Sequence, residues 1–316
     1  MNKYILLMVV LLVPLSVFAQ KQATVGMGGE SAGSRVLDGH LFLPSDIVDD
    51  PFTPTYFDES TGFGLAGLST TDVDSQGNVA GTSQFNLGAI GQEFKLQVEA
   101  MDSLAIRFAA NGTVLSGIDA QSALIAGATL GYALSGGVTY SFMLGKVRMA
   151  GAFDLEYAPS YTVSPVGALL NTLSTGKIDA GTLFSSSQDI RLRPAFLAAV
   201  GLSPSIGLRG AIDFEEDVNK SGGQSANTGV IDLGTAVDFE LRSVTPLPLG
   251  VLAGYKVTIP TSGDSWGHQL TLGLFYTAQH NLGLGIQALV QLPSAPAGIS
   301  NYYVFTGSLL LRYYWS

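Results

Sequence analysis

The sequence predicts an all-β protein, a closed transmembrane antiparallel β-barrel of about 12 strands within a range of about 10–14. Apolar and polar residues alternate with a period of two along most of the chain, and charged residues fall almost entirely on one face of each segment. Charged residues make up 13% of the chain and 39 residues are glycine. Beyond the N-terminus, no charge-free apolar stretch is long enough for a spanning helix. Such a chain can still satisfy its backbone inside lipid as a closed barrel.

The N-terminus predicts export through a cleavable signal peptide. Lys3 precedes the apolar run Tyr4–Phe18, and Val17 and Ala19 occupy the −3 and −1 positions of a cleavage site. An uncleaved membrane anchor is the alternative, but the apolar run is short for a span and ends in a processing site.

We therefore expect a signal peptide in residues 1–19, an N-terminal extension in residues 20–60 and the barrel in residues 61–316. The chain has no cysteine, which excludes disulfides, cysteine-ligated metals and thiol catalysis. Its formal net charge of −10 gives no basic surface for nucleic acid.

Alternation is clearest in segments that carry charges. In Ser205–Glu216, for example, Leu208 and Ile212 share one face, while Arg209 and Asp213 share the other. The same pattern runs through Glu93–Ala100, Leu104–Ala110, Lys146–Tyr157, Gln188–Leu202, Val230–Arg242 and Tyr302–Ser316. A soluble sandwich also alternates, but it rarely sustains such long strands so regularly, whereas transmembrane strands need about 9–11 residues.

The polar faces carry twenty charged residues, ten basic and ten acidic, which in a barrel line the lumen. The candidate lumen charges include Lys146, Arg148, Asp154, Glu156, Arg191, Arg193, Arg209, Asp213, Asp232, Asp238, Glu240, Arg242 and Arg312. Apart from the terminal Glu216, the apolar faces of these segments carry no charge. Equal numbers of basic and acidic residues predict that the lumen charges pair with one another and give no strong ion preference. The basic residues gather toward one end, so a polarised channel is the alternative.

Short and long connections alternate along the chain, as expected for periplasmic turns and extracellular loops. The tight turns are Met101–Ser103, Gly145, Ser203–Pro204, Thr245–Pro248 and His280–Asn281, and the longer links are 111–135, 158–187, 217–229, 261–265 and 293–301. The first strand is either Thr61–Thr70 or Ser83–Ile90. Using both gives an odd number unless Ser83–Ala100 is one bulged strand.

The C-terminal strand carries a family resemblance. The segment Leu309–Ser316 alternates aromatics toward its end and resembles the closing strand of the bacterial outer-membrane β-barrel superfamily, with one departure: the aromatic Trp315 is penultimate and Ser316 is terminal. The resemblance implies a Gram-negative outer-membrane location, with outer-membrane lipid and the assembly machinery as partners. Aromatics near strand ends fit two interfacial girdles, Tyr157, Trp266 and Tyr303 at one rim and Tyr276, Tyr313 and Trp315 at the other.

Residues 20–60 lack periodicity and are expected to enter the barrel as a plug or to hang disordered beneath it. Two long links look apolar: Ser116–Asp119 resembles a capping box ahead of a predicted helix at Ala120–Leu134, and Pro165 precedes a second predicted helix. The candidate residues for hydrophobic capture are Leu124, Ile125, Leu169, Leu170 and Leu173. A plug beneath apolar loops is weakly similar in architecture to the long-chain fatty-acid transporter family, which has fourteen strands.

The sequence predicts no enzyme, cofactor or metal site. His268 faces lipid but has no serine two residues on, unlike the pair in the outer-membrane phospholipase. The acids Asp46, Asp49 and Asp50 lack the spacing of a calcium loop. We expect a channel or transporter for small, hydrophobic or amphipathic ligands. A structural or adhesive barrel without transport is the first alternative, and a lipid-modifying enzyme is the less favoured one.

Overall fold

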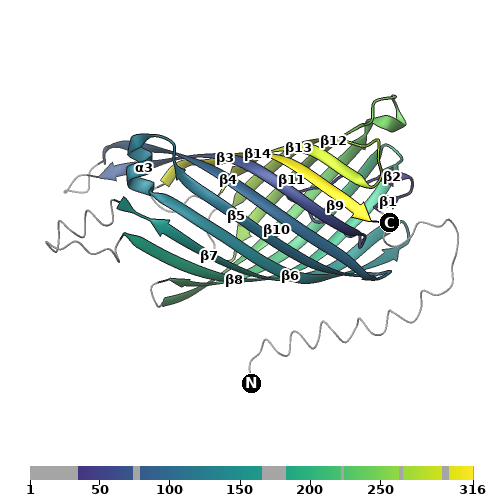
Figure 1. Cartoon of the computed structure of the whole chain (residues 1–316), viewed down its shortest axis with the longest axis horizontal. Coiled ribbons are helices and arrows are strands. Elements are labelled where there is room, and N and C mark those ends of the chain that lie inside the picture. Colours follow the sequence, from purple (N-terminus) through teal and green to yellow (C-terminus); the bar gives the residue numbers. More distant parts are fainter. Residues whose placement is uncertain are drawn as a thin grey trace, which may run out of the picture. The chain divides into compact units, whose positions relative to one another are not determined.

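The computed structural model describes residues 35–73, 79–165, 183–221, 224–262, 266–293 and 299–315. Within them, twelve antiparallel strands, β3 to β14, close into a barrel in which each strand pairs with its neighbours in sequence (Figure 1). The barrel closes where β14 pairs with β3, from Ile299 opposite Thr70 to Trp315 opposite Thr55. The predicted fold class and strand number are confirmed.

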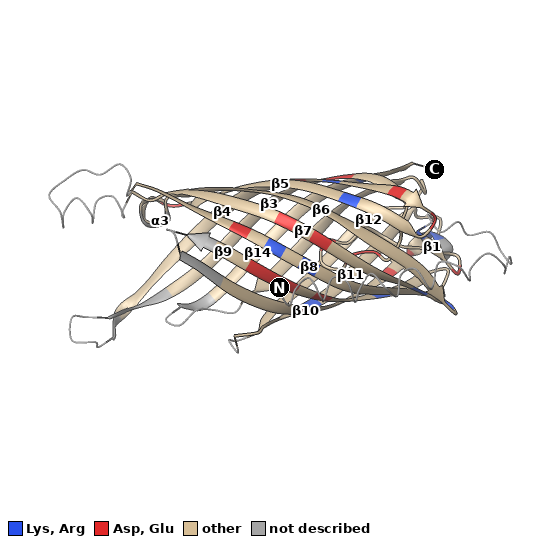
Figure 2. Cartoon of the chain, turned by 90° about the horizontal axis from the view of Figure 1, so that it is seen from below, with Lys and Arg blue, Asp and Glu red and all other residues tan. Residues whose placement is uncertain are grey.

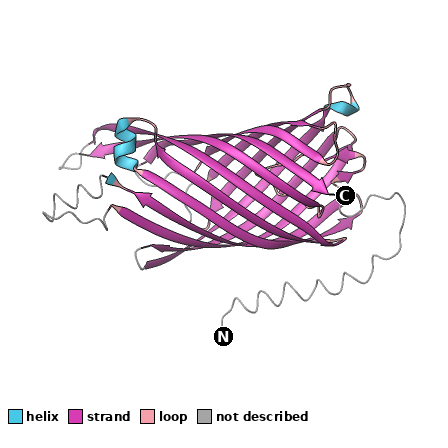
Figure 3. Ribbon diagram, viewed as in Figure 1, coloured by secondary structure: helices cyan, strands magenta, loops and turns pink. Residues whose placement is uncertain are grey.

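The strands dominate the structure, as Figure 3 shows. Their bounds are β3 Thr55–Val73, β4 Val79–Met101, β5 Leu104–Gly117, β6 Ala128–Leu144, β7 Val147–Val163, β8 Phe184–Ser203, β9 Ile206–Ser221, β10 Gln224–Glu240, β11 Leu249–Pro260, β12 Gly267–Tyr276, β13 Leu282–Leu292 and β14 Ile299–Trp315. A two-stranded hairpin, β1 (Val36–Leu37) and β2 (His40–Leu41), precedes them. The described residues also include the helix α3 (Ala120–Ala126) and a 3-10 turn at Leu241–Ser243.

The barrel begins earlier than the sequence suggested. Strand β3 starts at Thr55 rather than Thr61, and Ser83–Ala100 lies within the single long strand β4. Both candidate segments therefore form strands, as in the alternative in which Ser83–Ala100 is one bulged strand. The pairing of β4 with β5 shifts register between Glu99 and Met101, close to the turn. The predicted boundary at residue 61 was wrong because Glu59, on the apolar face, interrupts the alternation.

The predicted helix at Ala120–Leu134 is much shorter. It ends at Ala126 because Gly127 has a φ of 69°, and the chain then enters β6. Its N-cap is Asp119, whose carboxylate accepts hydrogen bonds from the backbone and hydroxyl of Ser122 at 2.8 Å. The expected capping box starting at Ser116 is therefore wrong.

Several links are also shorter than expected because the strands extend beyond the length a membrane requires. Strand β3 has 19 residues and β4 has 23, against about 9–11 for a span. The segment Val230–Arg242 ends as a strand at Glu240, since Leu241–Ser243 forms the 3-10 turn. The second predicted helix, after Pro165, falls in residues 166–182, outside the described residues.

Alternation places apolar side chains on the outside of the barrel. Phe63, Leu270 and Leu272 are 57–64% exposed, although they would be core residues in a soluble protein. Such a surface suits lipid rather than water. No helix in the described part of the chain is long and apolar enough to cross a membrane. We call the end with the tight turns, near Asp102, Gly145 and Pro204, the turn end, and the opposite end the loop end.

Candidate functional site

Residues 35–54, here called the inner segment, lie inside the barrel at its turn end. Phe42, Leu43, Val48 and Phe52 are no more than 2% exposed, although the segment has little secondary structure of its own. Each packs against the barrel wall in one of three apolar clusters. Ile47 and Val48 join Ala150, Leu197, Ala211 and Ala236; Phe42 and Phe52 join Ala199; and Leu43 joins Leu252, Phe275 and Leu310.

Two buried arginines of the wall hold the inner segment by charge. Arg209, 1% exposed, donates to both carboxylate oxygens of Asp238 at 2.7 Å and also pairs with Asp50. Arg312 donates to Asp58 at 2.7 Å and to Asp50 at 3.1 Å. The single carboxylate of Asp50 therefore accepts hydrogen bonds from two arginines of the wall. Hydrogen bonds between oppositely charged groups are stronger than those between neutral groups.

Hydrogen bonds that involve backbone carbonyls also hold the inner segment at several points along its length. Arg35 donates to the carbonyl of His280 at 3.0 Å and its guanidinium lies 4.3 Å from the centre of the Tyr314 ring. Gln97 donates to Pro54 at 2.8 Å, and Gln287 donates to Pro44 at 3.3 Å. These contacts come from the nearby strands β13, β14 and β4 and from the turn before β13, so they hold the segment against one side of the wall.

The wall is shaped to receive the inner segment. Gly250, Gly254, Gly283 and Gly234 face the lumen, and a Cβ at these positions would lie only 2.9–3.0 Å from Leu43, Ile47, Pro44 and Val48, respectively. Glycine permits this close approach, and any larger residue would push the segment away. Residues 35–54 therefore fill the bore at the turn end together with inward side chains of the strands such as Arg209, Arg312 and Phe275.

A third arginine of the wall also anchors the inner segment. Arg107 on β5 donates to Asp49 at 3.0 Å and also pairs with Asp154 on β7. Burial opposes ionisation of Asp49, but Arg107 and Lys95 hold the pKa of its carboxyl below the usual range. Burial raises the pKa of Asp46, whose carboxylate accepts from Ser308 at 3.4 Å.

Beyond the inner segment, charges concentrate on one side of the lumen, on β7 to β11. Arg191 pairs with Glu156 at 2.7 Å and lies 3.4–3.8 Å from the acids Asp189, Glu215 and Asp217. Other pairs join Arg193 to Glu215 at 3.2 Å and Lys256 to Asp232 at 3.0 Å. Figure 2 shows the charged residues of the chain as isolated blue and red segments on otherwise uncharged strands.

The charge balance of the lumen differs from the expected equality. On the described strands, twelve carboxylates face inward against eight cations. The carboxylates are Asp58, Glu93, Glu99, Asp154, Glu156, Asp189, Asp213, Glu215, Asp217, Asp232, Asp238 and Glu240, and the cations are Lys95, Arg107, Arg148, Arg191, Arg193, Arg209, Lys256 and Arg312. Lys146 and Arg242 were wrongly counted, because they lie in turns: Lys146 is 83% exposed and 4.0 Å from Asp38, and Arg242 bonds the Ala278 carbonyl.

The other predicted lumen residues are placed as follows. Arg148 is buried, with Ser141 at 3.5 Å, and Glu240 is buried near the turn end. Asp213 is half-buried on β9 and, within the described residues, makes no hydrogen bond or ion pair. Most of the predicted charges thus form ion pairs along the wall, but the acids predominate.

The predicted capture residues are resolved in part. Leu124 is 54% exposed on α3, and this helix is tied to β4 by Ser122, whose hydroxyl accepts from the Asn86 backbone at 3.1 Å. The side chain of Ile125, and Leu169, Leu170 and Leu173, lie outside what the structure describes. No cluster of three or more potential metal ligands occurs among the described residues.

Four acids of interest were missed in the sequence. Asp50 was considered as a calcium ligand and was not chosen as a site residue. Asp58 and Glu59 were assigned to the extension, and Asp217 lies one residue beyond the expected strand. A signal was present for Asp58, since Phe57 and Asp58 continue the alternation of β3. Nothing in the local pattern could have paired Asp50 with Arg209 and Arg312, which follow it by more than 150 residues.

The barrel resembles solved outer-membrane barrels. A FadL homologue from Pseudomonas aeruginosa matches with a TM-score of 0.52 and 13% identity, covering 92% of this chain and 99% of that one. The transport unit of the autotransporter AIDA-I from Escherichia coli matches with a TM-score of 0.50 and 10% identity, covering 88% and 95%. No protein-family model and no curated sequence matches the chain. The chain has the fold of the bacterial outer-membrane β-barrels, and its likeness to the fatty-acid transporter architecture holds at the level of that fold.

Proposed function

We propose that this protein is an outer-membrane channel for small amphipathic or hydrophobic molecules, gated by the inner segment. The observation that carries the proposal is the way the bore is filled. Glycine and alanine line the wall beside residues 35–54, so the strands leave an opening that a separate piece of chain occupies. A barrel that needed only a solid interior could fill it with larger strand side chains, as small barrels do.

The two sides of the lumen support the proposed substrate class. Ion pairs line β7 to β11, whereas lumen-facing positions such as Gly62, Gly64 and Ala66 on β3, with Val304 and Thr306 on β14, carry no charge. A molecule with both polar and apolar parts can satisfy both sides without burying an unpaired polar group. Exposed apolar residues at the loop end, such as Leu124, fit entry of such a molecule from that side.

Conductance in planar bilayers tests the proposal. Deleting residues 35–53 leaves Thr55 to start β3 and should raise single-channel conductance severalfold, because the bore loses its filling. Heat-modifiable gel mobility and circular dichroism would verify that the variant folds. A folded deletion variant that conducts no better than the full chain would contradict a gating role.

A structural barrel with a permanently filled lumen is the second candidate. It is favoured by the buried ion pairs of Asp50, which bind the inner segment firmly. In that case the full chain would show no opening events under any voltage, and cells producing the deletion variant would gain permeability that the parent never shows. The catalytic alternative receives no support from His268, whose ring accepts or donates a hydrogen bond at 2.7 Å to Tyr255 rather than to a serine.

A further inference from the structure

The carboxylate of Glu59 lies on the outer face of the barrel and not in the lumen. Glu59 shares the outward face of β3 with Phe57, Thr61 and Phe63, and Gln92 on β4 donates to it at 3.0 Å. Among strand residues whose side chains the structure describes, no lysine or arginine faces outward. Within this described part of the chain Glu59 therefore has no cationic partner, and it lies in a wall that should face lipid. An ionisable group in such a place is costly unless something neutralises it.

Glu59 lies near the membrane interface of the turn end. Phe57, two residues closer to the rim, stacks on Phe94 with 6.2 Å between ring centres and pairs in register with Tyr313. Tyr313 and Trp315 form an exposed aromatic pair that marks the interface. Two residues of a tilted strand rise by about 5 Å along the barrel axis. The carboxylate therefore lies at the edge of the apolar band, within reach of lipid headgroups.

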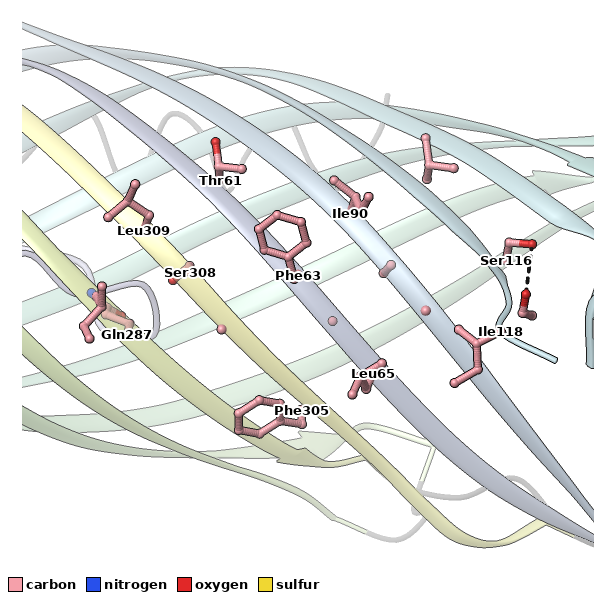
Figure 4. Close-up of a pocket in the computed structure, with 17 residues that line it drawn as sticks. Thr61, Phe63, Leu65, Ile90, Ser116, Ile118, Gln287, Phe305, Ser308 and Leu309 are labelled. Atoms are coloured by element: carbon pink, nitrogen blue, oxygen red, sulfur yellow. Dashed lines mark hydrogen bonds between the residues drawn. The ribbon is translucent and has the colours of Figure 1, made fainter.

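An apolar groove of about 870 Å³ begins at Thr61, two residues beyond Glu59 on the same face of β3, and extends toward the loop end. Figure 4 shows Phe63 and Leu65 of β3 along it, between Ile90 on one side and Phe305 and Leu309 of β14 on the other. Gly307 forms part of its lining, and a Cβ there would have no atom within 4 Å, so the groove exists because the wall lacks a side chain. Its volume lies in the range of about 300–1,000 Å³ that is typical of small-molecule sites.

We propose that Glu59 and this groove bind a phospholipid whose headgroup carries a primary ammonium. The ammonium pairs with Glu59 beside the carbonyl oxygen of Gln92, and the acyl chains lie in the groove. The arrangement has the polarity of a lipid, with its charge at the interface and its chains pointing into the apolar band. An anionic headgroup would be repelled by Glu59, and a second copy docked about a twofold axis would bring two Glu59 carboxylates together. Charge complementarity thus favours the ammonium lipid.

Native mass spectrometry of the full chain tests this proposal with three lipids of identical acyl chains. These are phosphatidylethanolamine, phosphatidylcholine, whose quaternary ammonium cannot donate a hydrogen bond, and anionic phosphatidylglycerol. We expect the first to be retained at least severalfold more than the other two. Glu59→Gln should remove that preference, whereas Glu216→Gln, at the other outward carboxylate, should leave it intact. Gly307→Leu should reduce retention of all three lipids by filling the groove.

Two results would overturn the proposal. Equal retention of the three lipids by the full chain would show that Glu59 does not select the headgroup. A dimer that dissociates in Gly307→Leu, without any change in lipid retention, would show that a second copy covers the groove. If Glu59→Gln failed to fold, Gln92→Leu would take its place, and an unaltered preference in that variant, together with full retention in Gly307→Leu, would also exclude the site.

Discussion

Replacing Asp50 by asparagine tests whether charge holds the inner segment in the bore. Asp50 accepts from both Arg209 and Arg312, and a hydrogen bond to a charged group contributes about 1.5–3 kcal/mol. Asparagine can still accept one such bond, and both arginines keep a carboxylate of the wall, so the expected loss of docking free energy is about 2–3 kcal/mol. Since about 1.4 kcal/mol is a factor of ten, the undocked population should rise about 30- to 140-fold.

The assay is the open probability of single channels, read together with hydrogen exchange of residues 35–54. Asp38→Asn is the matched control, because its partner Lys146 is 83% exposed at 4.0 Å and such a pair contributes at most about 1 kcal/mol. Added salt should weaken the control pair more than the Asp50 pairs, which are shielded inside the barrel. If Asp50→Asn changed opening and exchange no more than Asp38→Asn does, the electrostatic account of docking would be wrong.

Four further outcomes follow from the same contacts. Asp238→Asn should make opening rarer, since Arg209 would then depend on Asp50 alone; more frequent opening would contradict this. The double variant Gly39→Cys, Pro204→Cys should form a disulfide, because the two Cβ positions lie 3.9 Å apart, within the usual range of about 3.5–4.5 Å. This disulfide should keep the channel closed until it is reduced. Opening of the oxidised protein would show that the β1–β2 hairpin does not move when the channel opens. The pKa of Asp49 is depressed in the folded state, so the stability that this carboxylate contributes is complete above the ordinary carboxyl pKa of 3.8 and is lost as the pH falls below that value. Hydrogen exchange of the inner segment should therefore accelerate below pH 3.8 in the parent and not in Asp49→Asn. The channel lacking residues 35–53 should prefer cations, as its reversal potential in a potassium chloride gradient would report, and an anion preference would refute the counted charge balance.

The barrel could be predicted from the sequence because the charged residues indicate which face of each strand lines the lumen. Leu208 beside Arg209 is enough to orient β9, and the same reading orients β7 and β10. It failed where local residue types were ambiguous. Ala120–Leu134 is rich in alanine and leucine, which suit a helix, but pairing with β5 and β7 makes its second half, Ala128–Leu134, a strand.

The candidate site was less accessible to sequence reading. The length, apolar clusters and acidic residues of the N-terminal extension indicated a piece of chain that needs burial, yet its partners are set by tertiary geometry. Gly250 and Gly254 read as ordinary strand glycines, and only the structure shows that Leu43 and Ile47 approach them. Glu59 was assigned to the N-terminal extension, because one carboxylate on an apolar face breaks the pattern by which strands are recognised.

The wall arginines explain how a firmly held segment could still leave the bore. Arg209 donates to Asp238, Arg312 to Asp58 and Arg107 to Asp154, and all three carboxylates belong to the strands. Each arginine therefore keeps a charged partner when Asp50 or Asp49 departs, and no buried cation is stranded, which would otherwise cost about 3–5 kcal/mol. The departing acids enter water, where carboxylates are well solvated. A wall that is neutralised in both states lowers the free-energy difference between docked and undocked forms, which is the condition for a two-state gate rather than a permanent filling.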